Sequence, residues 1–296
     1  MRAARIHAYG PPDVIRLDDV DRPEPGPGQV LVEVAATSFN PTETALRAGV
    51  LRDLLGQDPP LPLTLGWDVA GTVVARGPGV HTPDVGDRVI GMIDAAAAEF
   101  TVAAADALVP APASLALADA AALPLAGMTA WQLVERAALT PGERVLVNGA
   151  GGGIGGYAVQ LARRAGAHVI ATASARSRAA VLANGADEIL DHTTTALAAA
   201  GPVDVVLHLV PAAEQRIAEL VALARRIVSA TNPIPGAPAA HVVTRNDPKH
   251  LAALADLVDR RELTVDVSER HTIADLPAIH RRGEAGDLRG KVVLRP

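Results

Sequence analysis

The chain lacks cysteine altogether and is poor in aromatic residues, with two Trp, two Tyr and two Phe among 296 positions. Without cysteine there can be no disulfide, no thiolate nucleophile and no zinc site built on Cys ligands. Few rings are left to stack on a flat substrate. Thiol chemistry is therefore excluded, and the compartment has to be judged from other features.

Charge and hydropathy exclude two kinds of partner. The net charge of −6 and the lack of a basic tract give no reason to expect a nucleic acid. The N-terminal stretch MRAARIHAYG has no apolar core of signal-peptide length. The Ala-rich region 95–130 is interrupted by acidic residues and prolines, which rules out a membrane span there. We therefore expect a cytoplasmic protein with neither nucleic acid nor membrane as a partner.

Two textures divide the sequence. Residues 1–110 contain short Val-rich runs separated by Pro and Gly turns, a pattern typical of a small β-barrel. From Ser114 onward, apolar strands alternate with helical segments, which indicates a parallel sheet with helices on both faces. The end, GKVVLRP (290–296), is again a Val-rich strand. The sequence therefore predicts an α/β protein with a barrel part and a doubly wound part.

A glycine-rich turn stands at the start of the parallel region. Gly149, Gly152 and Gly155 follow the strand-like RVLV and precede a helical pattern. Glycines allow a tight turn and close approach of a ligand, and a helix N-terminus favours a phosphate. Residues 145–174 also have the length of one strand–helix–strand unit. A P-loop and a hydrolase elbow are excluded, because no Lys-Ser or Lys-Thr pair follows and no Ser lies in the turn. The alternative to a phosphate site is a sharp turn without a ligand.

The strand after this turn ends in Ser174, where NAD-binding folds usually place an acidic residue for the ribose hydroxyl. Arg176 and Arg178 follow, and no acidic residue occurs between Glu143 and Asp187. A carboxylate would repel a 2′-phosphate, whereas Ser and Arg can bind one. The pattern predicts NADPH rather than NADH. The alternative is that both arginines lie on a solvated helix face.

Five segments, in order, carry a resemblance to a known family. They are PLTLGWDVAGTVVARGPGV, VGDRVIGM, AAALPLAGMTAWQLV, VLVNGAGGGIGGYAVQLARRAGAHVIATAS and GADEILDH. With the terminal GKVVLRP they resemble the quinone oxidoreductase branch of the medium-chain dehydrogenase/reductases over nearly the whole chain. The resemblance implies a GroES-like β-barrel domain at residues 1–115, completed by residues 265–296, and a Rossmann domain at residues 116–264. It also implies NADPH in the cleft between the domains and, in many members, a homodimer.

Zinc-dependent relatives carry a Cys at the position of Asn40, a His at Trp67 and a further Cys in the stretch matching LPLAG. All three are lost here, as are the four cysteines of the structural zinc lobe. The resemblance therefore implies a metal-free member, with no Lewis acid to polarise a carbonyl. That disfavours simple alcohol oxidation and favours hydride delivery to an acceptor that is already electrophilic.

The resemblance assigns two candidate catalytic residues, Asn40 and Thr129, to positions beside the nicotinamide. Asn40 can orient a carboxamide or a substrate oxygen, or can simply form an Asx turn before Pro41. Thr129 either approaches the cofactor or bonds back to a helix carbonyl. The implied cofactor-binding residues add the diphosphate loop, the 2′-phosphate pair, a His against the ribose or adenine, and a segment near the nicotinamide. The full set is Asn40, Thr129, Gly152, Gly153, Ile154, Ser174, Arg178, His192, Ala230 and Thr231.

Several positions depart from the family pattern. Many enoyl reductases have a Tyr proton donor after the RAG turn, where this chain has Val50 and Leu51. Glu43 stands where relatives often have Asp, and we interpret it as a surface or ion-pairing residue rather than an acid. His208 replaces the usual Asp, and it either enters the cofactor cleft or is a satisfied His at a strand end. His192 likewise either stacks on the cofactor or simply ends its strand.

These features predict an NADPH-dependent, zinc-independent oxidoreductase that transfers hydride to a quinone or another conjugated carbonyl acceptor. Because no general acid is evident, the proton is expected to come from water or from a substrate oxygen. Two alternatives stay open. One is an enoyl or enone reductase of a biosynthetic pathway, and the other is a non-catalytic NADPH-binding redox sensor.

Overall fold

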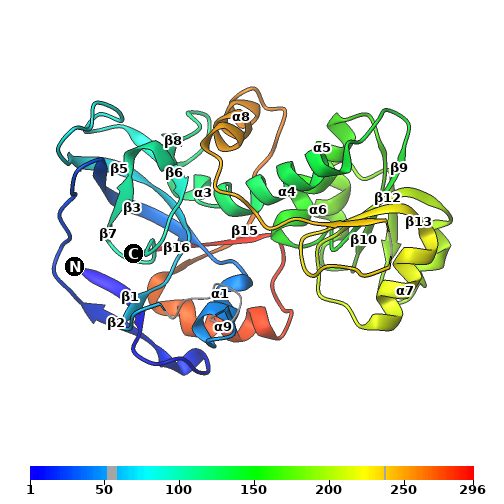
Figure 1. Cartoon of the computed structure of the whole chain (residues 1–296), viewed down its shortest axis with the longest axis horizontal. Coiled ribbons are helices and arrows are strands. Elements are labelled where there is room, and N and C mark those ends of the chain that lie inside the picture. The colour runs from blue at the N-terminus through cyan, green and yellow to red at the C-terminus, as the bar shows by residue number, and fades with distance from the viewer. Residues whose placement is uncertain (52–58, 237) are drawn as a thin grey trace. The chain divides into compact units, whose positions relative to one another are not determined.

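The computed structural model describes residues 1–51, 59–236 and 238–296. Contacts among these residues divide the chain into two compact units. Unit 1 comprises Met1–Leu125 and Asn246–Pro296, and unit 2 comprises Ala126–Arg245. The blue N-terminal and the red C-terminal strands therefore belong to the same unit (Figure 1).

A six-stranded sheet forms the centre of unit 2, in the order β11-β10-β9-β12-β13-β14 (Figure 1). All its neighbouring strands are parallel. The strands are β9 (Arg144–Asn148), β10 (His168–Ala173), β11 (Glu188–Asp191), β12 (Val203–His208), β13 (Ala224–Ser229) and β14 (Ala239–His241). This is the doubly wound order that the sequence predicts. The reversal between β9 and β12 opens the crevice in which such sheets bind ligands.

Helices cover both faces of this sheet. They are α4 (Pro124–Ala137), α5 (Gly153–Arg164), α6 (Arg178–Ala183) and α7 (Glu214–Leu223), with the 3-10 helix η3 (Leu197–Ala200). Helix α5 packs on β9 and β10, and α7 packs on β13. Strand–helix–strand crossovers are right-handed, and the strand order runs outward from β9 in one direction and from β12 in the other. Helices α5 and α7 therefore lie on opposite faces of the sheet.

The interior of unit 2 explains why these strands are nearly continuous apolar runs. Leu146 of β9 and Val206 of β12 are 0% exposed, and Ile170 of β10 is 1% exposed. These side chains belong to one cluster with Leu220 of α7 and Leu197 of η3. A strand covered on both faces cannot alternate polar and apolar residues, so the Val-rich pattern follows from burial.

Unit 1 is built mainly on antiparallel strands. One sheet has the order β15-β16-β3-β5-β6-β8, with β7 pairing to β3, and a smaller sheet has the order β2-β1-β4. The strands are β1 (Arg2–Ile6), β2 (Ile15–Asp19), β3 (Gln29–Ser38), β4 (Leu63–Thr64), β5 (Asp68–Arg76), β6 (Arg88–Met92), β7 (Phe100–Ala104), β8 (Leu108–Pro110), β15 (Val267–Thr272) and β16 (Lys291–Arg295). The C-terminal β16 pairs with β3, so the two segments of unit 1 meet in this sheet.

The helices of unit 1 are short, apart from α8 and α9. They are α1 (Thr42–Arg47), α3 (Leu117–Ala120), α8 (Pro248–Asp259) and α9 (Leu276–Glu284), with the 3-10 helices η1 (Pro12–Val14), η2 (Ala105–Ala107) and η4 (Ile273–Asp275). The Asp247 side chain caps α8 by accepting from the N–H of Lys249. At the other end, Asp259 accepts from the N–H groups of Ala113 at 3.1 Å and Ser114 at 2.8 Å.

These contacts place α8 in unit 1, whereas the sequence boundaries at residues 115 and 265 assign it to the dinucleotide-binding domain. The first two residues of α4, Pro124 and Leu125, also belong to unit 1, although they lie beyond the predicted boundary at residue 115. The N–H of Leu125 donates to Asp68 Oδ1 at 2.7 Å, which ties that residue to strand β5. The local sequence pattern predicts each of these helices, but it does not reveal the surface on which the helix packs.

Gly155 controls how closely α5 follows β9. A Cβ at this position would collide with the carbonyl oxygen of Gly149 and would lie 2.5 Å from the Cα of Ala150. Both are backbone atoms, which cannot move aside as a side chain can. We expect Gly155→Ala to lower the free energy of unfolding by about 1–3 kcal/mol, the usual effect of overpacking. Urea denaturation of the full chain measures this change.

Gly156→Ala is the matched control, one residue further along the same helix. The nearest atom to a Cβ there is the side-chain amide nitrogen of Asn184, at 3.1 Å. Ala is the better helix former by up to about 1 kcal/mol, so this variant should be no less stable than the wild type. Equal losses of stability in the two variants would refute the steric role of Gly155.

Candidate functional site

Helix α5 follows strand β9 through a turn of glycines. Gly149 has a φ of +102°, a conformation that side chains rarely adopt. Gly152 is the N-cap, and Gly153 and Ile154 begin the helix. No side chain among the described residues caps this end of α5. The first N–H groups and the positive end of the helix dipole are therefore available to an anion such as a phosphate.

A second loop packs against this turn through Ser177, which is 5% exposed. A Cβ on Gly151 would lie 2.5 Å from the Ser177 hydroxyl oxygen, so the contact requires glycine. Ser177 Oγ accepts from the N–H of Ser174 at 3.2 Å, and the Ser174 carbonyl accepts from the N–H of Arg178 at 3.0 Å. The structure thus brings the predicted 2′-phosphate pair next to the glycine turn. Sequence reasoning missed Ser177, whose one signal is its spacing of three from Ser174, as in a local hydroxyl turn.

The ends of β10 and β11 bring Arg178 and His192 close to Asp191. The hydroxyl and the N–H of Thr193 donate to Asp191 Oδ1 at 2.6 and 2.9 Å, and these bonds hold the pKa of Asp191 below its usual value. The charges of His192 and Arg178 lower this pKa further. Arg178 and His192 are both exposed. The predicted phosphate-binding and adenine-side residues therefore lie at one edge of the sheet.

A chain of hydrogen bonds runs inward from the glycine turn. The N–H of Gly149 donates to Thr172 Oγ1 at 2.8 Å, and this hydroxyl lies 3.3 Å from Asn148 Oδ1. Asn148 Nδ2 lies 2.9 Å from His208 Nδ1. The side chains of Thr172, Asn148 and His208 are buried, and burial lowers the pKa of His208. His208 is therefore a hydrogen-bonded, neutral His at the end of β12.

The segment after β13 lies beside the end of β12. The N–H of Ala230 donates to the carbonyl of His208 at 2.9 Å, and Thr231 Oγ1 lies 3.2 Å from Ser229 Oγ. Thr231 and His208 line the same cavity. The two residues predicted near the nicotinamide are thus adjacent to His208, on the side of the sheet away from β10.

Thr129 and Gln132 lie one turn apart on α4, where they bind the segment that ends unit 2. Thr129 Oγ1 lies 2.6 Å from Thr244 Oγ1. The Gln132 amide accepts from the N–H of Arg245 at 3.0 Å and donates to its carbonyl at 2.8 Å. Thr129 is 4% exposed, so its hydroxyl faces a protein partner in this structure.

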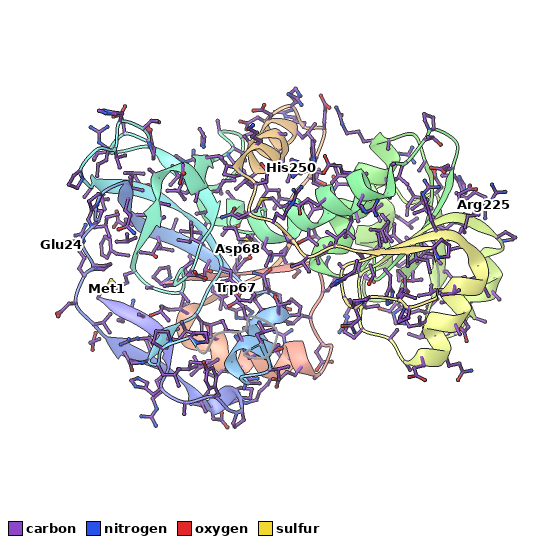
Figure 2. The ribbon with its side chains drawn as sticks, viewed as in Figure 1. Met1, Glu24, Trp67, Asp68, Arg225 and His250 are labelled. Atoms are coloured by element: carbon purple, nitrogen blue, oxygen red, sulfur yellow. The ribbon has the colours of Figure 1, made fainter. Side chains whose placement is uncertain are left out.

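Asn40 lies in unit 1 within a buried polar cluster that also contains Ser38, Glu43, Asp68 and Lys291. Asn40 Nδ2 donates to Asp68 Oδ2 at 2.8 Å and to Glu43 Oε1 at 3.2 Å. Lys291 Nζ donates to Asn40 Oδ1 at 2.7 Å and lies 3.4 Å from Asp68 Oδ2. The Ser38 hydroxyl donates to the same carboxylate oxygen. Figure 2 marks Asp68, which begins strand β5.

Glu43 is not the surface residue that the sequence suggested, because it is only 1% exposed. Burial raises the pKa of Glu43 to about 8, and the carboxylate of Asp68 adds to the rise. The hydrogen bond from Asn40 and the charge of Lys291 act in the opposite direction. Glu43 therefore keeps its proton at neutral pH, and the charged groups of the cluster are one Asp and one Lys. A carboxyl with this pKa is suited to act as an acid near neutral pH.

Two general features of the described residues concern metals and membranes. Among the described residues there is no group of three or more His, Asp or Glu side chains that could hold a metal ion. The same part of the chain contains no helix with the length and apolar character that crossing a bilayer requires.

The raised pKa of Glu43 makes stability depend on pH. The unfolded carboxyl titrates near 4.5 and the folded one near 8, so the native state binds more protons between these values. The contribution of Glu43 is complete below pH 4.5 and is lost as the pH approaches 8, at up to about 1.4 kcal/mol per pH unit. We expect the wild type to lose stability relative to Glu43→Gln over this range, as measured by urea unfolding at several pH values.

Glu99→Gln serves as the control for this comparison. Hydrogen bonds from the backbone and side chain of Arg2 lower the pKa of Glu99, so this carboxyl is ionised in both states once the pH is more than about one unit above 4.5. Its replacement should leave the pH dependence unchanged. A stability difference between the wild type and Glu43→Gln that is constant with pH would show that Glu43 is ionised in the folded protein.

Two protein families match the sequence. The family described as Alcohol dehydrogenase GroES-like domain matches residues 26–113, and the family described as Zinc-binding dehydrogenase matches residues 184–294. The first match falls within unit 1 and confirms the predicted GroES-like domain.

The chain is also similar to individual proteins of known name and to solved structures. The quinone oxidoreductase of Mus musculus is 40% identical over 197 residues, which cover 65% of this chain and 58% of that protein. The chain thus spans about three fifths of the length of the curated relatives it matches. Among solved structures, a mycobacterial protein complexed with NADPH is 29% identical, with a TM-score of 0.86 over 100% of both chains.

The quinone oxidoreductase from Coxiella burnetii gives the match that decides the family. It is 30% identical, with a TM-score of 0.92, over 100% of this chain and 99% of that one. Sequence and fold therefore agree along the full length, which confirms the predicted fold class. The chain belongs to the quinone oxidoreductase branch of the medium-chain dehydrogenase/reductase superfamily.

Proposed function

We propose that the protein is an NADPH-dependent, zinc-independent oxidoreductase that transfers a hydride to a quinone or another conjugated carbonyl compound. The observation that carries this proposal is the uncapped start of α5 beside a Ser174–Arg178 loop, in a stretch without acidic residues. The relatives support it, because the mouse protein is named a quinone oxidoreductase and the mycobacterial structure contains NADPH.

The residues around the glycine turn fit the phosphates of NADPH. The N–H groups of Gly153 and Ile154 hold the diphosphate, since no side chain of the described residues competes for the start of α5. Gly152, whose own N–H donates to the carbonyl of Gly149 at 3.2 Å, shapes the turn that the diphosphate contacts. The Ser174 hydroxyl and the Arg178 guanidinium hold the 2′-phosphate. The Asp191 carboxylate nearby is already engaged by two hydrogen bonds from Thr193, which limits its repulsion of a phosphate.

The remaining cofactor contacts follow the resemblance. His192 lies against the ribose or the adenine, and Thr129, Ala230 and Thr231 lie on the nicotinamide side. When bound, NADPH supplies the hydride, while the protein supplies orientation and a dry site.

Asn40 has the role of orienting the carboxamide or the acceptor oxygen. Its amide is held at both ends, by Lys291 on the oxygen and by Asp68 on the nitrogen, so it keeps a single orientation. A quinone suits this site as the acceptor, since its reduced oxygens can take their protons from water and the reaction then needs no dedicated acid. Glu43 carries a proton at neutral pH, and its Oε1 accepts a hydrogen bond from Asn40 Nδ2 at 3.2 Å. It is therefore the protonated carboxyl next to Asn40.

We further propose that the protein works in the cytoplasm as a homodimer. The support for the dimer is that β14 ends the parallel sheet and pairs within it only with β13 in the described part of the chain. A free strand edge is a natural place for a second copy to pair. The mass of the protein in solution tests this proposal.

Substitution of Arg178 tests the predicted choice of cofactor. One charge-assisted hydrogen bond to a phosphate is worth about 1.5–3 kcal/mol, and exposure reduces this value. We expect Arg178→Ala to raise the KM for NADPH about tenfold, to change kcat by less than about twofold and to leave the KM for NADH unchanged. Steady-state oxidation of each nucleotide, with a panel of quinones and α,β-unsaturated ketones, measures these constants.

Arg176→Ala is the matched control, because Arg176 is an exposed Arg of the same loop to which the family pattern assigns no phosphate. It should change the KM for NADPH by less than about twofold. Equal use of NADH and NADPH by the wild type would mean that the loop does not bind a 2′-phosphate. Turnover of enones alone would make the protein an enone reductase, and tight NADPH binding without turnover would make it a sensor.

A further inference from the structure

The acidic residue Asp191 ends the strand next to the one that leads to the 2′-phosphate loop. Asp191 is the last residue of β11 and pairs with Ala173, the last residue of β10, in the parallel register of these strands. The N–H of His192 donates to the carbonyl of Ala173 at 3.2 Å. Ser174 follows Ala173 directly in the chain. The two strand ends therefore bring a carboxylate to the edge of the sheet that carries the predicted phosphate site.

Strand β11 has an acidic residue at each end, and only one of them lies at this edge. Glu188 begins the strand, and its Oε1 lies 2.6 Å from His168 Nε2 at the start of β10. Asp191 ends the strand. Parallel strands place their carboxyl ends at the same edge of a sheet, which is the edge where such sheets bind ligands. Asp191 is therefore on the cofactor side, and Glu188 is on the opposite side.

The neighbouring Thr193 holds the Asp191 carboxylate without cancelling its charge. The hydroxyl and the N–H of Thr193 donate to Oδ1 at 2.6 and 2.9 Å. Among the residues that the structure describes, none gives the other oxygen, Oδ2, a hydrogen bond or an ion pair. Hydrogen bonds to a carboxylate favour its ionised form, in line with the lowered pKa of Asp191. At neutral pH this side chain is a fixed negative charge with one oxygen open to its surroundings.

A phosphate at the predicted site would experience two opposite charges. The N–H of Arg178 donates to the carbonyl of Ser174 at 3.0 Å, so Arg178 and Ser174 belong to one loop. The charges of Arg178 and Asp191 are close enough to act on each other. A phosphate monoester carries a charge of about −1.5 to −2 at neutral pH, so Arg178 attracts it and Asp191 repels it. NADH has a neutral hydroxyl at the same place and experiences neither effect.

We propose that Asp191 is a specificity-determining residue that opposes Arg178, so that the balance of these two charges sets how strongly the protein prefers NADPH over NADH. The inference rests on the proposed function in one respect, namely that Ser174 and Arg178 hold the 2′-phosphate. The repulsion acts on the phosphate itself, and it is therefore independent of the side chain at position 178.

Calorimetric binding of NADP⁺ and NAD⁺ to the full chain measures this balance without any turnover. We expect Asp191→Asn to lower the Kd for NADP⁺ about fivefold, and to change the Kd for NAD⁺ by less than about twofold, because the charge lies near solvent. The amide oxygen of Asn still accepts from Thr193, which preserves the loop. Asp191→Glu keeps the charge and should bind NADP⁺ as the wild type does.

Two further measurements separate charge repulsion from a structural effect. The gain of Asp191→Asn should nearly vanish in about 1 M salt, where charges are screened within about 3 Å. A change in the shape of the loop would not respond to salt in this way. The same gain of about fivefold should appear when Asp191→Asn is added to Arg178→Ala, since the two charges act separately on the phosphate.

Glu188→Gln is the matched control, because it removes the same charge from the other end of the same strand. It should change the Kd of either nucleotide by less than about twofold. An unchanged Kd for NADP⁺ in Asp191→Asn, or an equal change for both nucleotides, would overturn the inference. A wild type that binds both nucleotides equally, with a fivefold gain for NADP⁺ alone in Asp191→Asn, would remove the proposed NADPH dependence and leave the role of Asp191 standing. A wild type that prefers NADP⁺, with no gain in Asp191→Asn, would do the reverse.

Discussion

The close approach of helix α5 to the end of strand β9 is the constraint on which the rest of unit 2 depends. Gly155 has no room for a Cβ, because the backbone of Gly149 and Ala150 lies against it. This contact fixes where α5 begins and therefore where its uncapped N–H groups lie. It also holds the N–H of Gly149 toward Thr172, where the hydrogen-bond chain to His208 starts. The glycine turn and the hydrogen-bond chain to His208 thus depend on the same backbone atoms.

Unit 1 depends instead on the balance of buried charges. Lys291 of β16 and Asp68 of β5 are 3% and 0% exposed, and Asn40 lies between them. Loss of one partner would leave a buried charge uncompensated, at a cost of about 3–5 kcal/mol. A second ionised carboxyl would have the same effect, which explains why Glu43 keeps its proton. The cluster joins the last strand of the chain to the loop that carries Asn40.

The features that sequence reasoning predicts are local ones. The spacing of Gly149, Gly152 and Gly155 predicts the turn, since it reports backbone conformation and close contact over a few residues. The alternation of apolar strands and helices predicts the parallel sheet for the same reason. The prediction that Ser174 and Arg178 bind the 2′-phosphate likewise rests on the fixed number of residues between them and the turn.

The features that were missed depend on neighbours far along the chain. Asn148 and His208 are 60 residues apart and meet only through the register of β9 with β12. Glu43 is flanked by polar residues, and its burial comes from β5 and β16, which no local pattern reveals. Helix α8 could be recognised from its sequence, but its packing on β8 and the hydrogen bonds of Asp259 to Ala113 and Ser114 could not.

Hydride transfer from NADPH to a quinone is the central claim, and anaerobic single-turnover mixing tests it most directly. The protein is mixed with NADPH that carries deuterium at the transferred position and with 2-methyl-1,4-naphthoquinone. The predicted result is oxidation of one NADPH per quinone reduced, with a primary isotope effect on a rate that the protein accelerates over the protein-free reaction. Saturable NADPH binding with no oxidation of the cofactor by any quinone would contradict the account.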